Sequence, residues 1–331
     1  MKNFFVIITT VLLVNALCFF CYNPLHGSDL NSYRLEPNTV GVNLVEGFGI
    51  MYADENGFSN KREPLIEQNY ILVMGSSYSK ADQVPVDYRY SGLLNRYLGY
   101  EKELGVYNLA YNGGKFDDIV KNFQELITEF PNSEAIIIEV TDSQLKFDEN
   151  DYFNAMNQIQ IENSVTGEKL SEHDTMGKVR LAIKEYCPLL LLYVNQYTQW
   201  KNSLQEQSNS IEGIETEKED ADIEYQYFEN MVELLRQEYE KEIIIVYHNG
   251  FSLDENNKMN TDFSETGKNF LLACQENGMT VLDMSQVFSK HFDETREIPY
   301  GFWNTSMGAG HLNKIGHHLI AQEIYGYLKG N

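Results

Sequence analysis

Short apolar runs alternate with longer amphipathic segments along most of the chain from Tyr70 onward. The runs are rich in Val, Ile or Leu and have the length of buried strands, and they occupy residues 70–74, 105–110, 135–140, 242–247 and 279–283. Segments with helical periodicity lie at about 88–98, 116–129, 177–202, 224–241, 264–277 and 313–328. Apolar strands separated by helices predict a parallel sheet covered on both faces, in a three-layer α/β/α sandwich.

The first apolar stretch is of a different kind. Residues 4–20 form an uncharged run of 17 residues after Lys2. Its length is marginal between the core of a signal peptide and a membrane-spanning helix. No small residues suited to a cleavage site follow it, so residues 1–26 are interpreted as an uncleaved anchor rather than a cleaved signal. The single Lys2 on the short side predicts that the remainder is exported.

Two further segments interrupt the alternating pattern. Residues 27–68 are polar and broken by turns, and we expect a tether followed by a hairpin at 49–57, packed beside the domain formed by residues 69–331. Residues 203–222 are polar and acidic. They are interpreted as a solvated surface loop, with a mobile flap over the site as the alternative.

Composition excludes several classes of function. The chain has 25 basic and 49 acidic residues, a net charge of −24, which repels nucleic acid and anionic lipid headgroups. Of the four cysteines, Cys18 and Cys21 lie in the apolar leader, and Cys187 and Cys274 lie in apparent helices. No metal-ligand spacing occurs, so we expect no structural zinc, no required disulfide and no cofactor.

A serine turn follows the first predicted strand. The run 70–74 ends in Gly75-Ser76-Ser77, which suits a strand that delivers a hydroxyl to the edge of the sheet. A serine attacks as a nucleophile only when a base takes its proton. Ser77 is therefore a candidate nucleophile, although a serine that bonds its own backbone in a turn has the same pattern.

His311 is the candidate base. It lies between glycines in the stretch 307–316, just before the last amphipathic helix, where Asn313 is a credible N-cap. His248, at the end of the fourth strand, is a lesser candidate at the same edge of the sheet. His317 and His318 fall inside the helix, where packing or exposure is expected rather than catalysis.

A third motif lies at 106–114, where a strand runs into Gly113-Gly114 before a helix. Glycine permits a close approach of a backbone N–H to a substrate, as an oxyanion hole requires. A tight strand-to-helix turn is the structural alternative.

Together the three motifs resemble those of the SGNH, or GDSL-type, hydrolase family over residues 69–329. The segment 71–77 resembles its first block, which implies that Ser77 is the nucleophile, with Ser76 replacing the usual aspartate. The segment 108–113 resembles the second block, whose glycine, here Gly113, supplies an oxyanion-hole N–H together with that of Ser77. The segment 310–316 resembles the last block, with His311 as base. The resemblance implies a five-stranded sheet in flavodoxin-like order.

Two positions depart from the family pattern. The third block carries no asparagine, so Ser143 or Thr141 is a candidate oxyanion donor, with backbone N–H groups alone as the alternative. Gly308 stands where the family has an aspartate that orients the histidine. Asp142 and Asn304 are candidates for that role, and the alternatives are a Ser-His dyad or a domain without activity.

These observations predict an extracytoplasmic serine esterase, anchored by its N-terminal segment or secreted if the leader is cleaved. The expected substrate is an acylated glycan or a small ester. The enzyme is expected to remove O-acyl groups, and acetyl groups in particular, from a cell-envelope or extracellular polysaccharide. The alternatives are an O-acyltransferase of the same fold acting on cell-wall glycans, and a non-catalytic glycan-binding domain. Contact with the membrane is expected through the leader alone.

Overall fold

The computed structural model describes residues 2–23, 25, 33–61, 68–101, 104–145, 186–190, 192–194, 196–197, 218–305 and 308–330. The chain divides into two compact units. The first comprises Met1–Pro24, Gly41–Val45 and Phe147–Glu215, and the second comprises Leu25–Val40, Glu46–Lys146 and Thr216–Asn331. The sheet and the candidate site both lie in the second unit.

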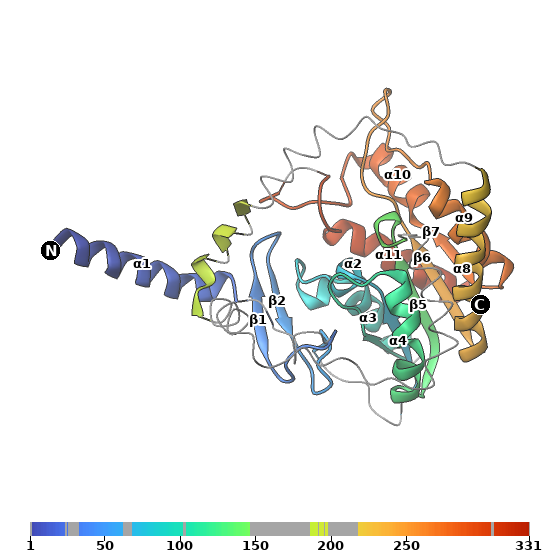
Figure 1. Ribbon diagram of the computed structural model, residues 1–331, viewed down its shortest axis with the longest axis horizontal. Coiled ribbons are helices and arrows are strands. Elements are labelled where there is room, and N and C mark those ends of the chain that lie inside the picture. The colour runs from blue at the N-terminus through green and yellow to red at the C-terminus, as the bar shows by residue number, and fades with distance from the viewer. Residues whose placement is uncertain are drawn as a thin grey trace. The chain divides into compact units, whose positions relative to one another are not determined.

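A five-stranded parallel sheet forms the centre of the second unit, in the order β4-β3-β5-β6-β7 (Figure 1). The flavodoxin-like prediction is therefore confirmed. The chain passes from β3 to β4 on one side and then returns to β5 on the other, so the carboxyl end of β3 lies at the switch point where α/β sheets bind ligands. The strands are β3 (Tyr70–Met74), β4 (Gly105–Asn108), β5 (Ser133–Val140), β6 (Glu242–Tyr247) and β7 (Thr280–Asp283).

Helices cover both faces of this sheet, as predicted (Figure 1). On one face, alternate strand residues pack in a single cluster with α3 (Tyr90–Glu101), α10 (Met284–Thr295) and α11 (Lys314–Gly330). The other layer contains α4 (Phe116–Glu129), α8 (Lys218–Glu238) and α9 (Glu265–Glu276). The helices of this layer pack together through aromatic rings, because the Phe270 ring makes edge-to-face contacts with the rings of Phe116 and Phe228.

Helix α10 was absent from the sequence prediction. Its buried residues Met284, Phe288 and Phe292 are spaced by four and lie on one face. Asp283 caps it, because its carboxylate accepts a hydrogen bond from the Ser285 N–H at 2.8 Å. This helix follows β7 without a loop, so the strand and helix patterns merge in the sequence. The shorter elements are β1 (Val40–Asn43), β2 (Gly49–Tyr52), α2 (Ser77–Lys80), η1 (Val86–Tyr88) and η2 (Asp142–Gln144).

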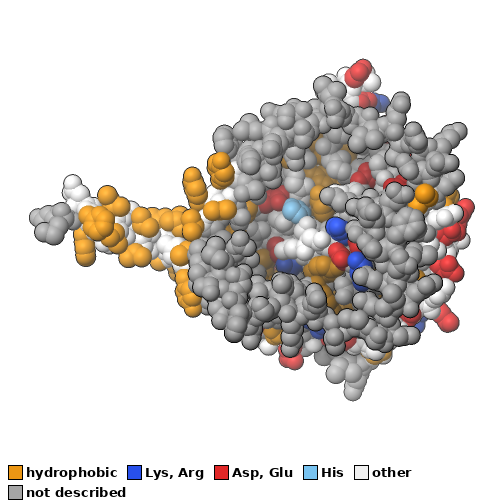
Figure 2. Space-filling view, viewed as in Figure 1, with side chains coloured by type: hydrophobic (Ala, Val, Ile, Leu, Met, Phe, Trp, Pro, Cys, Tyr) orange, Lys and Arg blue, Asp and Glu red, His pale blue; other side chains and the backbone are white. Residues whose placement is uncertain are grey.

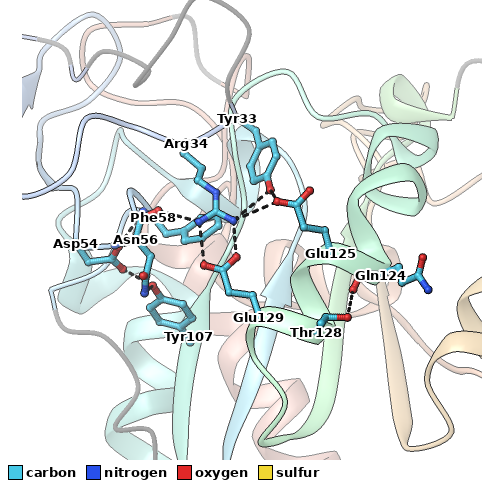
Figure 3. A network of polar contacts seen from close by, with 10 residues as sticks. All are labelled: Tyr33, Arg34, Asp54, Asn56, Phe58, Tyr107, Gln124, Glu125, Thr128 and Glu129. Carbon is cyan, nitrogen blue, oxygen red and sulfur yellow. Dashed lines mark hydrogen bonds and ion pairs between the residues drawn. The ribbon is translucent and has the colours of Figure 1, made fainter. Parts of the chain in front are cut away.

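Polar contacts fix the segment before β3 to the sheet and to α4 (Figure 3). Arg34 pairs with Glu129 of α4, with Nη1 3.0 Å from Oε1, and its guanidinium lies 5.0 Å from the centroid of the Phe58 ring. Asp54 accepts a hydrogen bond from the Tyr107 hydroxyl of β4 at 2.6 Å. This part of the predicted tether is thus held by ion-pair, cation–π and hydrogen-bond contacts.

The first unit contains α1 (Lys2–Cys21). Residues Asn3–Cys21 are long and apolar enough to cross a membrane, and apolar side chains surround the helix (Figure 2). By length and composition this helix suits either a membrane anchor or a signal sequence. The predicted helix 177–202 lies mostly outside the described residues, as do residues 203–217 of the acidic segment 203–222, whose last five residues begin α8.

Candidate active site

The turn after β3 presents a serine at the start of a short helix. Gly75 has a φ of +156°, and a Cβ there would lie 2.5 Å from Ser79 Oγ, so the turn has room for glycine alone. Ser76 is the N-cap of α2, and its hydroxyl accepts a hydrogen bond from the Tyr78 N–H at 3.3 Å. Ser77 is consequently the first helical residue, and its side chain is free of the capping role.

The structure brings together the two residues that the sequence singled out. Ser77 Oγ lies 2.8 Å from His311 Nε2, although the residues are 234 positions apart in the sequence. The imidazole follows the Gly310 turn immediately before α11, whose N-terminus is capped by Asn313, with Oδ1 2.9 Å from the Ile315 N–H. Ser77 lies at the switch point of the sheet because it stands three positions after Met74, the last residue of β3.

A glutamate that the sequence prediction missed completes this arrangement. Glu46 Oε2 lies 2.6 Å from His311 Nδ1, and Oε1 accepts a hydrogen bond from the His311 backbone N–H, also at 2.6 Å. A carboxylate can only accept, so Nδ1 carries the proton and Nε2 is left to accept the Ser77 hydroxyl proton. Glu46 is only 7% exposed, so the charge of its carboxylate acts on His311 with little screening by water. Ser77, His311 and Glu46 therefore have the connectivity of a serine triad.

Glycines around His311 make the approach of Glu46 possible. Gly310 has a φ of +90°, and a Cβ there would lie 2.1 Å from Glu46 Oε1. Gly308, where the family resemblance implies an aspartate, has a φ of +78° and lies against the Phe251 ring, 2.3 Å from the position of a Cβ. The side on which that aspartate would stand is therefore filled by an aromatic ring, and the carboxylate comes from another segment.

The side chain that lies against His311 Nδ1 is that of Glu46, and not one of the two residues that the sequence suggested for this role. Asp142 accepts hydrogen bonds from the Ser264 hydroxyl, at 2.8 Å, and from the Tyr247 hydroxyl. Asn304 accepts a hydrogen bond from the Gly47 N–H at 2.8 Å. This corrects both assignments: Asp142 belongs to a separate contact with β6 and α9, and Asn304 fixes the backbone next to Glu46.

The second motif lies against the serine turn. The Tyr111 N–H donates to the Gly75 carbonyl at 3.3 Å, and the Asn108 amide donates to the carbonyl of Ser79 in α2 at 2.8 Å. Gly113 has a φ of +78° and is exposed, with open space where a Cβ would stand. The loop that carries Gly113 is thus fixed to the turn that carries the nucleophile.

The third motif contributes a glutamine to the same turn. The Gln144 amide is buried and donates to the Ser76 hydroxyl, while its oxygen accepts from the Thr141 N–H at 2.9 Å. Ser143, a candidate oxyanion donor, is exposed and lies 2.8 Å from the Thr141 hydroxyl. Gln144 therefore supports Ser76, the N-cap of α2. The contact of Ser143 with Thr141 lies within its own turn.

A second, buried polar network lies behind the triad. Glu139 and His248 are fully buried, with Oε1 2.9 Å from Nε2, and the other oxygen of Glu139 accepts from the Ser79 hydroxyl at 2.9 Å. His248 Nδ1 also lies 2.7 Å from the Tyr300 hydroxyl. Because its two ring nitrogens both have partners inside the fold, His248 supports the core rather than facing a substrate.

Tyr78 separates the triad from this network. Its ring centroid lies 4.9 Å from that of His311 and 5.2 Å from that of His248. Burial, together with the nearby Glu139 and Glu46 carboxylates, raises the pKa of Tyr78 to about 12. The phenol therefore stays neutral at physiological pH and packs against both imidazoles.

Neither a family model nor a curated protein matches this chain. Similar solved structures include an acetyl xylan esterase, AlAXEase, with 11% identity, a TM-score of 0.42 and coverage of 78% of this chain and 98% of its own. A member of the lipolytic protein G-D-S-L family from Veillonella parvula has 12% identity, a TM-score of 0.40 and coverage of 78% and 96%. The esterase EstA from Pseudoalteromonas sp. has 10% identity, a TM-score of 0.40 and coverage of 80% and 98%. Similarity this low carries no argument about activity.

The geometry itself indicates a chemistry. A hydroxyl, an imidazole and a carboxylate in hydrogen-bonded series are the parts that activate serine for acyl transfer. Among the described residues, no three His, Cys, Asp or Glu side chains are grouped to hold a metal ion. The sequence offered no direct signal for Glu46, which lies 265 positions from His311 in a segment read as a tether.

Proposed function

We propose that this protein is a serine ester hydrolase of the SGNH type, with Ser77 as nucleophile, His311 as base and Glu46 as the orienting carboxylate. The observation that carries the proposal is the continuous series from Ser77 Oγ to His311 Nε2 at 2.8 Å and from His311 Nδ1 to Glu46 Oε2 at 2.6 Å. A domain that had lost catalysis would have no need of this arrangement, and the carboxylate missing at Gly308 is supplied by Glu46.

In the proposed reaction, His311 Nε2 takes the Ser77 proton as Oγ attacks the ester carbonyl carbon. The resulting imidazolium is stabilised by Glu46, and it then protonates the leaving alcohol when the ester C–O bond breaks. Water attacks the acyl-serine in the second half, with His311 again as base, and releases the carboxylic acid. The Glu46 contact favours catalysis because it stabilises the charge that His311 gains.

Backbone N–H groups are the proposed oxyanion donors. The Ser77 N–H belongs to the nucleophile residue itself, at the first position of the four-residue helix α2, so it lies close to the carbonyl that Oγ attacks. Gly113 lies in the loop that is fixed to the Gly75 turn. Together they supply two donors for the tetrahedral intermediate, in keeping with the family resemblance.

The substrate and location are further parts of this proposal. The apolar helix α1 suits an N-terminal membrane anchor, with the catalytic unit on the extracytoplasmic side. There the available esters include O-acyl groups on polysaccharides of the cell envelope, and acetyl is the proposed acyl group. The net charge of −24 favours a neutral glycan over a polyanionic one.

Hydrolysis of p-nitrophenyl acetate by the full-length chain in detergent tests the reaction. Ser77→Ala and His311→Ala are expected to lower kcat by about 10⁴-fold or more, since both are needed for the same step. His318→Ala, an exposed histidine of α11, is the matched control and keeps the parent rate. Equal turnover by the parent chain and the Ser77→Ala variant would contradict the proposal.

A covalent probe separates the nucleophile from other serines. A fluorophosphonate is expected to add to Ser77 of the parent chain with loss of fluoride, giving a mass increase located on the peptide that contains residue 77. Labelling is expected to disappear in Ser77→Ala and to persist in Ser143→Ala. Labelling at another serine would reassign the nucleophile.

A further inference from the structure

A pocket of about 370 Å³ is lined in part by the segments that carry Glu46 and His311. This volume falls in the range of sites for small ligands, about 300–1,000 Å³. Most of its lining is apolar and consists of Phe48, Pro85, Phe302, Trp303 and Ile315.

The pocket shares two segments with the triad. Gly47 follows Glu46 directly, and Asn313 lies two residues after His311, and both line the pocket. The loop that carries Trp303 is fixed to the histidine segment, because the Gly301 N–H donates to the His311 carbonyl at 3.0 Å. A group bound in the pocket is therefore adjacent to the segments that hold the base and its carboxylate.

The aromatic residues at this pocket are unusually exposed. Trp303 is 79% exposed and Phe48 is 45% exposed, and exposed apolar groups that gather at a pocket mark a ligand site. The face of an aromatic ring is negative, and the C–H groups on one side of a pyranose ring are weakly positive, so the two attract when stacked. A narrow channel for an alkyl chain would enclose its aromatic residues, whereas Trp303 forms an open platform.

Polar groups at the pocket suit a sugar without charge. Gln83 lines it, is only 8% exposed, and its Oε1 has no hydrogen-bond partner among the described residues. The last torsion of glutamine is soft, so the amide can turn this oxygen toward a donating hydroxyl. Lys314 also lines the pocket, but its ammonium lies 4.2 Å from the centroid of the Tyr88 ring, which already attracts it.

We propose that this pocket is a subsite for a neutral pyranose unit of the substrate, with Trp303 as the stacking platform and Gln83 as a hydrogen-bond acceptor. The inference rests on the proposed esterase function, and it identifies the alcohol portion of the ester as part of a glycan. In this proposal the pyranose stacks on Trp303, beside the segments that carry His311 and Glu46.

Binding is measured without catalysis, on the full-length Ser77→Ala chain in a detergent that has no sugar headgroup. The probes are xylohexaose, cellohexaose and chitohexaose, each titrated by calorimetry. At least one is expected to bind, and Trp303→Ala is expected to weaken it by about tenfold or more, the effect of roughly 1.4 kcal/mol of lost stacking. Trp303→Phe is expected to retain most of the affinity, because it keeps an aromatic face.

Leu272→Ala is the matched control, since Leu272 is a 45% exposed apolar residue of α9 outside the pocket. It is expected to leave the affinity unchanged. Gln83→Leu, which keeps the size but removes the acceptor, is expected to weaken binding by about fivefold, the cost of roughly one neutral hydrogen bond.

The outcomes separate this inference from the esterase itself. Absence of binding by all three oligosaccharides, or binding that Trp303→Ala does not alter, overturns the subsite. Trp303→Ala can also be made in the chain that retains Ser77. If it raises only the KM for p-nitrophenyl octanoate and leaves oligosaccharide binding unchanged, the subsite is overturned and the pocket is assigned to an acyl chain. Oligosaccharide binding that depends on Trp303, in a protein whose turnover does not need Ser77, supports the subsite and contradicts the esterase.

Discussion

The Glu46 carboxylate contacts both the backbone and the ring of His311. One of its oxygens lies 2.6 Å from the main-chain nitrogen of His311, and the other lies 2.6 Å from Nδ1. The backbone contact fixes the position of the residue, and the ring contact fixes its tautomer. A single side chain therefore does two tasks that the base needs before it can accept a proton from Ser77.

Glu46→Gln is expected to lower kcat for p-nitrophenyl acetate by about 10²–10⁴-fold with a small change in KM. The amide cannot stabilise the imidazolium and can favour the wrong tautomer, as the loss of about 10⁴-fold in a well-studied triad illustrates. Steady-state kinetics of the purified chain measure the effect. Glu36→Gln, a change at an exposed glutamate, is the control, and a full rate in Glu46→Gln would remove Glu46 from the mechanism.

Gly310→Ala is expected to lose activity through Glu46. The new Cβ would lie 2.1 Å from Glu46 Oε1 at a φ of +90°, so the flexible end of the glutamate side chain must move away from His311. Gly278→Ala has a similar φ of +68° but open space around the Cβ, and it controls for backbone strain alone. In the Glu46→Gln background, Gly310→Ala is expected to lower kcat little further, because the contact is already lost. Additive losses would contradict this account.

Ser143→Ala is expected to change kcat by less than about threefold. Its hydroxyl is exposed and lies 2.8 Å from that of Thr141, whereas an oxyanion donor must point at the reacting carbonyl. Loss of a true donor costs about 10²–10³-fold in kcat. Kinetics of this variant therefore test whether the Ser143 hydroxyl is an oxyanion donor.

Glu139→Gln is expected to lower the free energy of unfolding by about 1–3 kcal/mol, the usual cost when a buried polar group loses its partner. Glu139 and His248 are both fully buried and 2.9 Å apart. Urea unfolding of the single variants and of Glu139→Gln with His248→Gln gives the coupling between them. A double variant as unstable as the sum of the singles would mean that the two side chains act independently.

His317 is expected to make the fold sensitive to acid. Burial, with Arg89, His248 and His311 nearby, lowers its pKa from the ordinary 6.5 to about 3. The unfolded chain therefore binds a proton between these pH values when the folded chain does not. Stability is fully present above pH 6.5 and declines as the pH falls toward 3, by up to about 1.4 kcal/mol per pH unit.

His317→Asn isolates this contribution. It keeps an acceptor near the Tyr90 N–H, which donates to His317 Nδ1 at 3.4 Å, and removes the titrating group. Urea unfolding between pH 7 and pH 4 is expected to show a shallower decline for the variant than for the parent chain. Parallel curves would assign the acid sensitivity to other groups.

The alternation of apolar runs and helical segments predicted a parallel sheet covered by helices, whereas the order of its strands was implied by the family resemblance. The predicted strands 70–74 and 242–247 and the predicted helix 116–129 match the structure to the residue, because each is a continuous apolar run or an amphipathic segment with polar or turn residues at its ends. Helix α10 escaped prediction because it follows β7 without a loop. The patterns that predict a strand or a helix involve residues close together in the chain, so they can be recognised in a single sequence.

The residues of the candidate site differ in the same way, because some lie in local sequence patterns and one does not. Ser77 and His311 were visible because each lies in a glycine-flanked turn next to a regular element. Glu46 was not visible, because a carboxylate on a turn-rich segment has no pattern that distinguishes it from the other acidic residues of the chain.

Tertiary structure alone decided which acid faces His311. The contacts of Arg34 with Glu129 and of Asp54 with Tyr107 fix the segments on either side of Glu46 to α4 and to β4 (Figure 3). Asn304 then fixes Gly47, and Gly310 leaves room for the carboxylate. Sequence determines elements through short-range periodicity, but a triad closed across 265 positions depends on the packing of segments that no local pattern relates.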